Sequence, residues 1–111
     1  MSYRLFLDDY RFPPNGEKWI IARSMKDAQW YVEKFGAPYC ISFDHDLADE
    51  HYADMAGDHE ETGYAFAKWF CGQVMDGRIT LPSDFSFRVH SMNPIGAENI
   101  RTYMNNFLTR R

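Results

Sequence analysis

The chain has 111 residues and a formal net charge of −4 at pH 7. This length is typical of one domain, so we expect residues 1–111 to form a single domain. Hydrophobic residues make up 45% of the chain, which argues against disorder, and the acidic balance argues against general nucleic-acid binding. No apolar run reaches the roughly 18 residues that a membrane span needs, so we expect no membrane partner.

The location of the acidic residues is more informative than their number. Half of the 16 acidic residues lie between Asp44 and Glu61, a stretch without lysine or arginine. Such a segment either repels itself into solvent or holds a cation. The two cysteines do not make a disulfide framework, and we expect free, buried thiols in a cytoplasmic protein.

Hydrophobic patterning and turn residues predict the order strand, strand, helix, strand, helix, strand, helix. The first two strands are joined by a segment that cannot be helical, because Pro13 and Pro14 lack amide donors. The helices are expected to begin at N-caps and to end at glycines or at the chain end. Strands are predicted over residues 4–7, 19–22, 39–43 and 85–89, and helices from Ser24 to Gly36, from Thr62 to Gly77 and from Asn93 to the C-terminus.

Strands that alternate with helices favour a mostly parallel sheet covered by helices. In such sheets, ligands bind at the carboxyl ends of the strands. Polar residues follow three of the predicted strands directly, at 8–9, 44–46 and 90–91. We therefore expect carboxylates, imidazoles and a hydroxyl to meet at one edge of the sheet.

The carboxylates of this edge are the candidate metal ligands. Crowded carboxylates raise one another's pKa unless a cation lies between them, and hard oxygen ligands favour Mg²⁺ or Ca²⁺, with Mn²⁺ also possible. The alternative is that the first pair is a solvated strand end and that Asp44 caps a helix. The predicted ligands are Asp8, Asp9, Asp44 and Asp46.

The candidate proton-transfer groups are His45 and His90, because a histidine can donate or accept a proton near neutral pH. The alternative for each is a ring that packs and bonds a backbone carbonyl. His51 and His59 lie in the acidic segment at a spacing that is not a metal-site signature, and we interpret them as solvent-exposed.

The candidate phosphate-binding residues are Arg11, Ser91 and Asn93. Arg11 follows the first acidic pair closely enough to reach a phosphate, or else it is a surface arginine paired with an acid. Ser91 and Asn93 precede a helix start, where exposed amides can bind an oxyanion. Asn93 also fits a simple N-cap.

Four blocks of sequence carry a resemblance: LFLDDYRFPP, ISFDHDL, TGYAFAKW and VHSMNPIGAENI. Together they resemble the cyclic-phosphate-processing receiver-like family, whose fold is similar to that of response-regulator receivers. The resemblance implies that Asp8 and Asp9 form the metal-binding acidic pair. It also implies that Asp44 is the central aspartate and that Ser91 is the hydroxyl after the fourth strand.

The chain departs from ordinary receivers in ways that bear on function. We expect the usual first helix to be missing or reduced to a loop, and we expect neither a fifth strand nor its lysine. His45, Asp46 and His90 have no counterparts in those receivers. We therefore expect an α/β, three-layer αβα fold with a mostly parallel four-stranded sheet, a reduced receiver-like (flavodoxin-like) topology without the fifth strand.

The resemblance implies a metal-dependent phosphoesterase that acts on a cyclic phosphate and uses Mg²⁺ or Mn²⁺. The substrate would be a small phosphorylated ligand, such as a cyclic nucleotide, or the 2′,3′-cyclic phosphate end of an RNA. One alternative is a non-catalytic receiver-like module that binds a phosphorylated ligand or a partner protein. Another is a signalling switch that accepts phosphate on Asp44, although the absent lysine argues against it.

Overall fold

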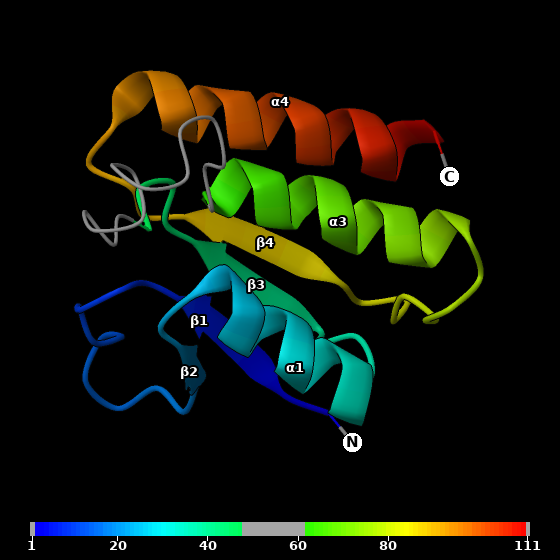
Figure 1. Cartoon of the computed structure of the whole chain (residues 1–111), viewed down its shortest axis with the longest axis horizontal. Helices are drawn as coiled ribbons and strands as arrows, with labels where there is room; N and C mark the ends of the chain where they lie inside the picture. The colour runs from blue at the N-terminus through cyan, green and yellow to red at the C-terminus, as the bar shows by residue number, and fades with distance from the viewer. Residues whose placement is uncertain (1, 48–61, 111) are drawn as a thin grey trace.

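The computed structural model describes residues 2–47 and 62–110 (Figure 1). The described residues form four strands and three helices in the predicted order, and three of the strands begin one residue later than expected. The elements are β1 (Arg4–Leu7), β2 (Ile20–Ala22), α1 (Met25–Phe35), β3 (Cys40–Phe43), α3 (Gly63–Met75), β4 (Ser86–Val89) and α4 (Pro94–Arg110).

The predicted helix caps are confirmed. The Ser24 hydroxyl accepts a hydrogen bond from the backbone N–H of residue 27 at 3.1 Å. Thr62 caps α3 in the same way at 3.0 Å, and the Asn93 side-chain oxygen caps α4 at 2.9 Å. Gly36 ends α1 with a φ of 83°, a conformation that other residues rarely adopt.

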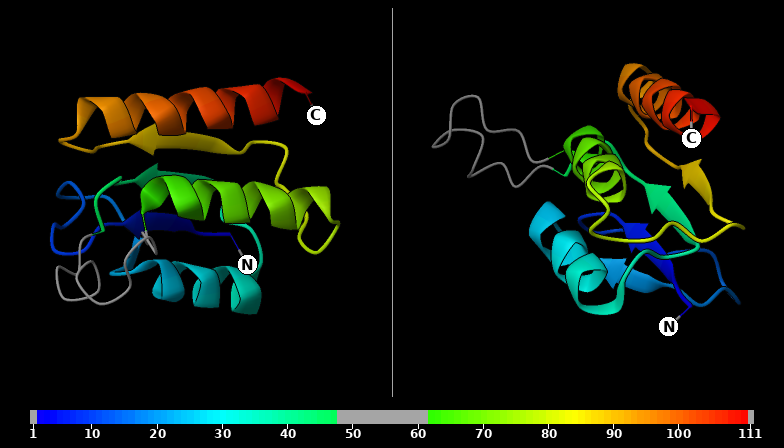
Figure 2. Two further views of the ribbon diagram at one scale, coloured as in Figure 1. Left: turned by 45° about the horizontal axis from the view of Figure 1, so that its top comes forward. Right: turned by 90° about the vertical axis from the view of Figure 1, so that its right-hand side faces the viewer.

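All four strands are parallel, in the order β2-β1-β3-β4. Because crossovers between parallel strands are right-handed, the steps from β2 to β3 and from β3 to β4 place α1 and α3 on the same face. α4 lies on that side as well, as the right-hand view of Figure 2 shows. The step from β1 to β2 runs in the opposite direction across the sheet, so its connection belongs to the other face.

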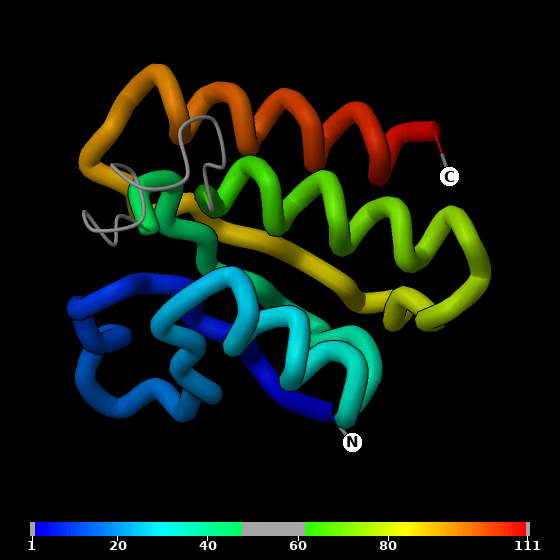
Figure 3. Tube along the Cα trace, viewed as in Figure 1, coloured from blue at the N-terminus to red at the C-terminus, as the bar shows by residue number. Residues whose placement is uncertain are grey.

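The connection between β1 and β2 contains no helix, as the trace in Figure 3 shows. Its last residue, Trp19, packs edge-on against Phe6 with ring centroids 5.8 Å apart. The guanidinium groups of Arg4 and Arg88 lie 4.9 and 5.5 Å from the Trp19 ring centroid. A loop therefore replaces one helical layer, and the expected reduced three-layer, receiver-like fold is confirmed.

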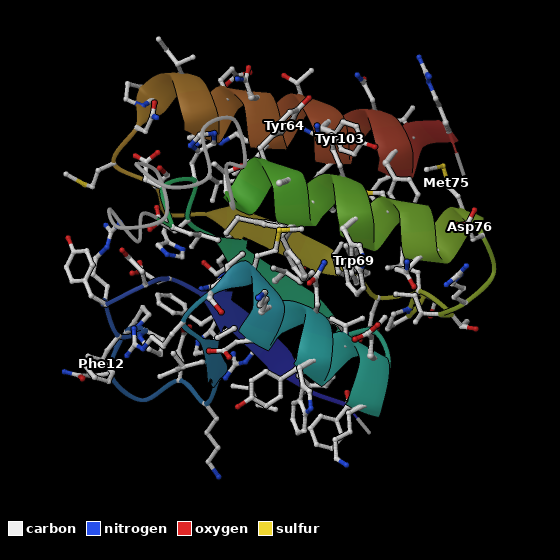
Figure 4. All side chains as sticks on the ribbon, in the orientation of Figure 1. Phe12, Tyr64, Trp69, Met75, Asp76 and Tyr103 are labelled. Carbon is white, nitrogen blue, oxygen red and sulfur yellow. The ribbon has the colours of Figure 1, made fainter. Side chains whose placement is uncertain are left out.

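The hydrophobic core lies between the sheet and the three helices. Alternate strand residues such as Leu5, Leu7 and Phe43 point into it, against Phe66 of α3 and Met104 of α4. Tyr64 and Tyr103 meet edge-on between α3 and α4, with ring centroids 5.8 Å apart (Figure 4).

Both cysteines, Cys40 and Cys71, are free and buried, as the sequence predicts. None of the described helices is both long enough and apolar enough to cross a membrane.

Candidate functional site

Three candidate residues form one row across the sheet. Asp8, Asp44 and His90 are each the first residue after their strand, and the register of the sheet aligns them. Each backbone N–H continues the ladder to the neighbouring strand, at 3.1, 3.0 and 2.9 Å respectively. One ligand atom from each side chain lies within 4.8 Å of the others, as a shared metal ion requires.

The row lies on the face of the sheet that none of the described helices covers. Side chains alternate along a strand, and Leu7 and Phe43, which precede the two aspartates, point into the helix-covered core. Asp8 and Asp44 therefore point to the opposite face. This places the site at the carboxyl edge of the sheet, where ligands bind in open parallel sheets.

Asp8 is fully buried and held by three hydrogen-bond donors and by the charge of Arg11. One oxygen accepts the backbone N–H groups of Tyr10 and Arg11 at 3.0 and 2.8 Å, and the other lies 2.9 Å from His90 Nε2 and 3.0 Å from Arg11 Nε. Burial raises the pKa of Asp8, but the two N–H donors, His90 and the Arg11 charge outweigh it and lower the pKa. Asp8 is therefore ionised at neutral pH.

Contacts with Phe6, Ser42 and Asp8 hold the His90 ring in place. Its ring stacks on Phe6, with centroids 4.4 Å apart and an interplanar angle of 6°. Nδ1 lies 2.7 Å from the hydroxyl of Ser42, a buried residue of β3. Because the Asp8 carboxylate only accepts, Nε2 carries the proton and Nδ1 accepts from Ser42. Burial lowers the pKa of His90, more than the neighbouring carboxylates raise it, so the imidazole is neutral.

Arg11 provides the cation in this arrangement. Its Nε lies 3.0 Å from Asp8 and its Nη2 lies 3.3 Å from Asp44. Nε is buried without an aligned hydrogen bond, so the contact with Asp8 is an ion pair of imperfect geometry. Arg23 holds the loop in place, because its guanidinium donates to the carbonyl oxygens of Arg11 at 2.6 Å and Asp8 at 3.3 Å.

The positive charge of Arg11 does not fully neutralise the carboxylates of this site. Burial and the negative charge of Asp8 raise the pKa of Asp44, and Arg11 only partly offsets them. Burial and the same charge raise the pKa of Asp9, whose Oδ1 is buried without a partner among the described residues. An orphaned carboxylate oxygen beside two further carboxylates fits a divalent cation, although Asp9 is not among the described residues whose ligand atoms lie within metal-binding distance of one another.

His45 and Asp46 lie beside this row and contact each other. His45 Nδ1 lies 2.9 Å from Asp46 Oδ1, and Asn93 Nδ2 donates to the same oxygen at 3.4 Å. The hydrogen bond from His45 lowers the pKa of Asp46 more than any other contact. Asp46 is more than half exposed and is not among the residues that the row brings within metal-binding distance.

Two glycines allow the helices to approach this edge. A Cβ on Gly63 would lie 1.7 Å from the backbone oxygen of Asp44, and a Cβ on Gly96 would lie 2.3 Å from the ring of His45. The Gly63 N–H also donates to the His45 carbonyl at 2.8 Å. The start of α3 therefore fixes the backbone of residues 44 and 45, and α4 supports the imidazole.

The three predicted phosphate-binding residues lie in two different places. Arg11 contacts the acidic row, whereas Asn93 serves as the N-cap of α4 and contacts Asp46. The Ser91 hydroxyl accepts the backbone N–H of Asn93 at 3.0 Å and shapes the turn that leads into α4. His51 and His59 lie outside the described residues, as does most of the acidic segment.

Sequence reasoning missed three residues that shape the site: Phe6, Ser42 and Arg23. Ser42 left a signal, since it is the one hydroxyl side chain in the apolar strand Cys40–Phe43. Phe6 gave none, because an aromatic residue in a buried strand is typical of any core. Arg23 also gave none, because its partners are backbone carbonyls of a distant loop.

Comparison with known proteins identifies a family. Residues 3–106 match the family model of the cyclic-phosphate processing receiver domain. No curated protein and no solved structure matches the chain. The match covers Asp8, Asp44 and His90 and the strands that precede them. The chain therefore belongs to the cyclic-phosphate processing receiver domain family.

Proposed function

We propose that this protein is a metal-dependent phosphoesterase that opens a cyclic phosphate. The observation that carries the proposal is the row of Asp8, Asp44 and His90 at the carboxyl edge of the sheet. Membership of a family described by cyclic-phosphate processing supports this substrate class. The substrates that fit are cyclic nucleotides and the 2′,3′-cyclic phosphate ends of RNA.

The carboxylates of Asp8, Asp9 and Asp44 would hold Mg²⁺ or Mn²⁺ in this proposal. The orphaned oxygen of Asp9 and the raised pKa of Asp44 support it, since both indicate uncompensated negative charge. Such a cation polarises a phosphoryl group and offsets the charge that develops on its oxygens.

Arg11 and Ser91 would orient the phosphate. Arg11 holds Asp8 and Asp44 through an ion pair of imperfect geometry, so a cation on those carboxylates would free the guanidinium for a phosphate oxygen. Ser91 lies two residues after β4, at the same edge of the sheet, and its hydroxyl, which accepts from the Asn93 N–H, can still donate its own proton. These donors would bind the two non-bridging oxygens.

Ring opening needs one proton removed from water and one proton given to the departing alkoxide. The water oxygen forms a bond to phosphorus while one P–O bond of the ring breaks. His45 and His90 are the candidates for these transfers. His45 is the better placed of the two, because both ring nitrogens of His90 already have partners within the protein.

The test is an assay of the purified protein with Mg²⁺ or Mn²⁺ against 2′,3′-cyclic nucleotides, cyclic dinucleotides and RNA with a 2′,3′-cyclic phosphate end. We expect turnover of at least one substrate and a loss of about 10²-fold or more in Asp44→Asn. The matched control is Asp76→Asn at the far end of α3 (Figure 4), which should keep full activity. Turnover of no substrate would reject the proposal.

A non-catalytic module is the second candidate, and one observation favours it. Arg11 already neutralises part of the negative charge of Asp8 and Asp44, a role that a metal ion would otherwise fill. This candidate predicts that calorimetry detects tight binding of a cyclic nucleotide in the presence of metal while chromatography detects no product.

A further inference from the structure

We propose that His90 is a nitrogen ligand of the metal, held in place by Ser42, and that the site therefore prefers Mn²⁺ to Mg²⁺. The inference rests on the metal site of the proposed function and changes its ligand set. The carboxylates alone would make an all-oxygen site, whereas Asp8, Asp44 and His90 make a mixed carboxylate–imidazole site.

The spacing of the donor atoms supports nitrogen ligation. His90 Nε2 lies 2.9 Å from Asp8 Oδ2. Two ligands on perpendicular bonds of about 2.1 Å lie about 3 Å apart, which is the spacing expected for neighbouring positions around an octahedral ion. The same Asp8 oxygen contacts Nε of Arg11, so a positively charged guanidinium already lies beside it.

The imidazole is held for this role before any ion binds. Phe6 stacks on its face, and Ser42 bonds its far nitrogen from the neighbouring strand. Metal-ligating histidines commonly bond their second nitrogen to a fixed partner, which sets the tautomer and the ring orientation. Ser42 is therefore a positioning residue.

Ser42 also allows the protons to balance. Before an ion binds, Nε2–H of His90 donates to Asp8 and Nδ1 of His90 accepts from the Ser42 hydroxyl. A metal needs the lone pair of Nε2, so the proton must move to Nδ1. A hydroxyl can accept as well as donate, so Ser42 can reverse its hydrogen bond and bind Nδ1–H. No proton has to leave the protein.

A nitrogen ligand changes the metal preference. Carboxylates and water suit Mg²⁺ and Mn²⁺ alike, whereas imidazole suits first-row transition metals. The affinity of mixed sites rises along that series from Mn²⁺ onward, and Mg²⁺ releases its water reluctantly. We expect Mn²⁺ to bind at least about tenfold more tightly than Mg²⁺.

The experiment detects the ligand directly. Metal-free protein is titrated with Mn²⁺, binding is followed by the loss of the free-ion electron paramagnetic resonance signal, and electron spin echo modulation then reports a directly bound nitrogen. We expect nitrogen modulation in the wild-type protein. It should disappear in His90→Gln and persist in His45→Gln, which separates the two imidazoles at this edge.

A second set of variants tests the role of Ser42. Ser42→Ala should weaken Mn²⁺ binding by about tenfold and broaden the nitrogen modulation, and Ser42→Thr, which keeps the hydroxyl, should restore both. The matched control is Ser86→Ala, on the same face of the neighbouring strand β4, which should bind Mn²⁺ like the wild type.

The outcomes separate this inference from the proposed function. Mn²⁺ that binds without nitrogen modulation would overturn the inference and leave an all-oxygen metal site and the phosphoesterase proposal in place. Modulation that persists in His90→Gln would also overturn it. Nitrogen modulation from His90 in a protein without turnover would support the inference and count against the phosphoesterase.

Discussion

A single side chain, Arg11, compensates the buried charge of the acidic row. Its guanidinium contacts Asp8 and Asp44, both buried, while its own side chain is 29% exposed. Under the proposed function a metal ion would take the same position, so arginine and metal would compete for the carboxylates. This competition gives the residue two opposite effects, one on stability and one on affinity.

We expect Arg11→Met to lower the free energy of unfolding of the metal-free protein by about 2 kcal/mol, because two buried carboxylates lose their counter-charge. The same variant should bind Mn²⁺ more tightly than the wild type, since no cation has to be displaced. Chemical denaturation and Mn²⁺ titration measure the two effects. Arg88→Met is the control, since its ion pair with Glu17 is exposed, and the change should stay within about 0.5 kcal/mol. Unchanged Mn²⁺ affinity in Arg11→Met would contradict the competition.

A second prediction at the residue scale concerns Asp44 and pH. Burial and the charge of Asp8 raise its pKa above the ordinary value of 3.8, so the folded protein binds this proton more strongly than the unfolded chain does. Ionised Asp44 therefore lowers stability at neutral pH, and this cost disappears as the pH falls below 3.8. Asp8 has the opposite sign, because its pKa is lowered and its contribution is lost in acid.

Asp44→Asn should therefore be more stable than the wild type at pH 7 without metal, and the difference should shrink on acidification. Denaturant midpoints of both proteins between pH 7 and pH 3 measure this. Inactivity of Asp44→Asn in the assay would then not reflect unfolding. A variant that is less stable at pH 7 would show that the pair with Arg11 outweighs the repulsion from Asp8.

At the scale of elements, the start of α3 determines where Asp44 and His45 lie. A Cβ on Gly63 would meet the backbone oxygen of Asp44, whereas a Cβ on Gly72, two turns further along α3, would meet nothing within 4 Å. Gly63→Ala should lower stability by about 3 kcal/mol, because backbone cannot move aside easily. Gly72→Ala should raise it by about 1 kcal/mol through helix propensity. Thermal denaturation of both variants separates the effect of the close contact from that of helix propensity. Equal changes in stability in the two variants would contradict the close contact at Gly63.

The elements were more predictable from sequence than the contacts between them. Ser24, Thr62 and Asn93 cap helices through hydrogen bonds to residues three positions away, and such local signals can be recognised in the sequence itself. The position of Asp8 and Asp44 after their strands was equally visible. Their alignment with His90 depends on the register of the strands, which cannot be predicted from the sequence. Ser42 is recognisable in the sequence as the one hydroxyl side chain of its strand, but its contact with His90 becomes evident only in the folded structure.

For the whole molecule, metal binding predicts a gain in stability that depends on ion concentration. An ion that binds only the folded state at 100 times its dissociation constant adds about 2.7 kcal/mol. In a domain of this size that raises the melting temperature by about 10 °C. Thermal denaturation with Mn²⁺ and again after chelation measures the gain. It should be absent in Asp44→Asn, and an equal gain in that variant would place the ion elsewhere.

The row of Asp8, Asp44 and His90 also has a consequence for folding kinetics. Its members come from three strands, and they align only after β1 has paired with β3 and β3 with β4. Parallel pairing of distant segments is slow, and the last pair forms late. The site therefore does not exist in a transition state that lacks β4. An ion bound there slows unfolding and leaves the folding rate unchanged, so it lengthens the lifetime of the native state.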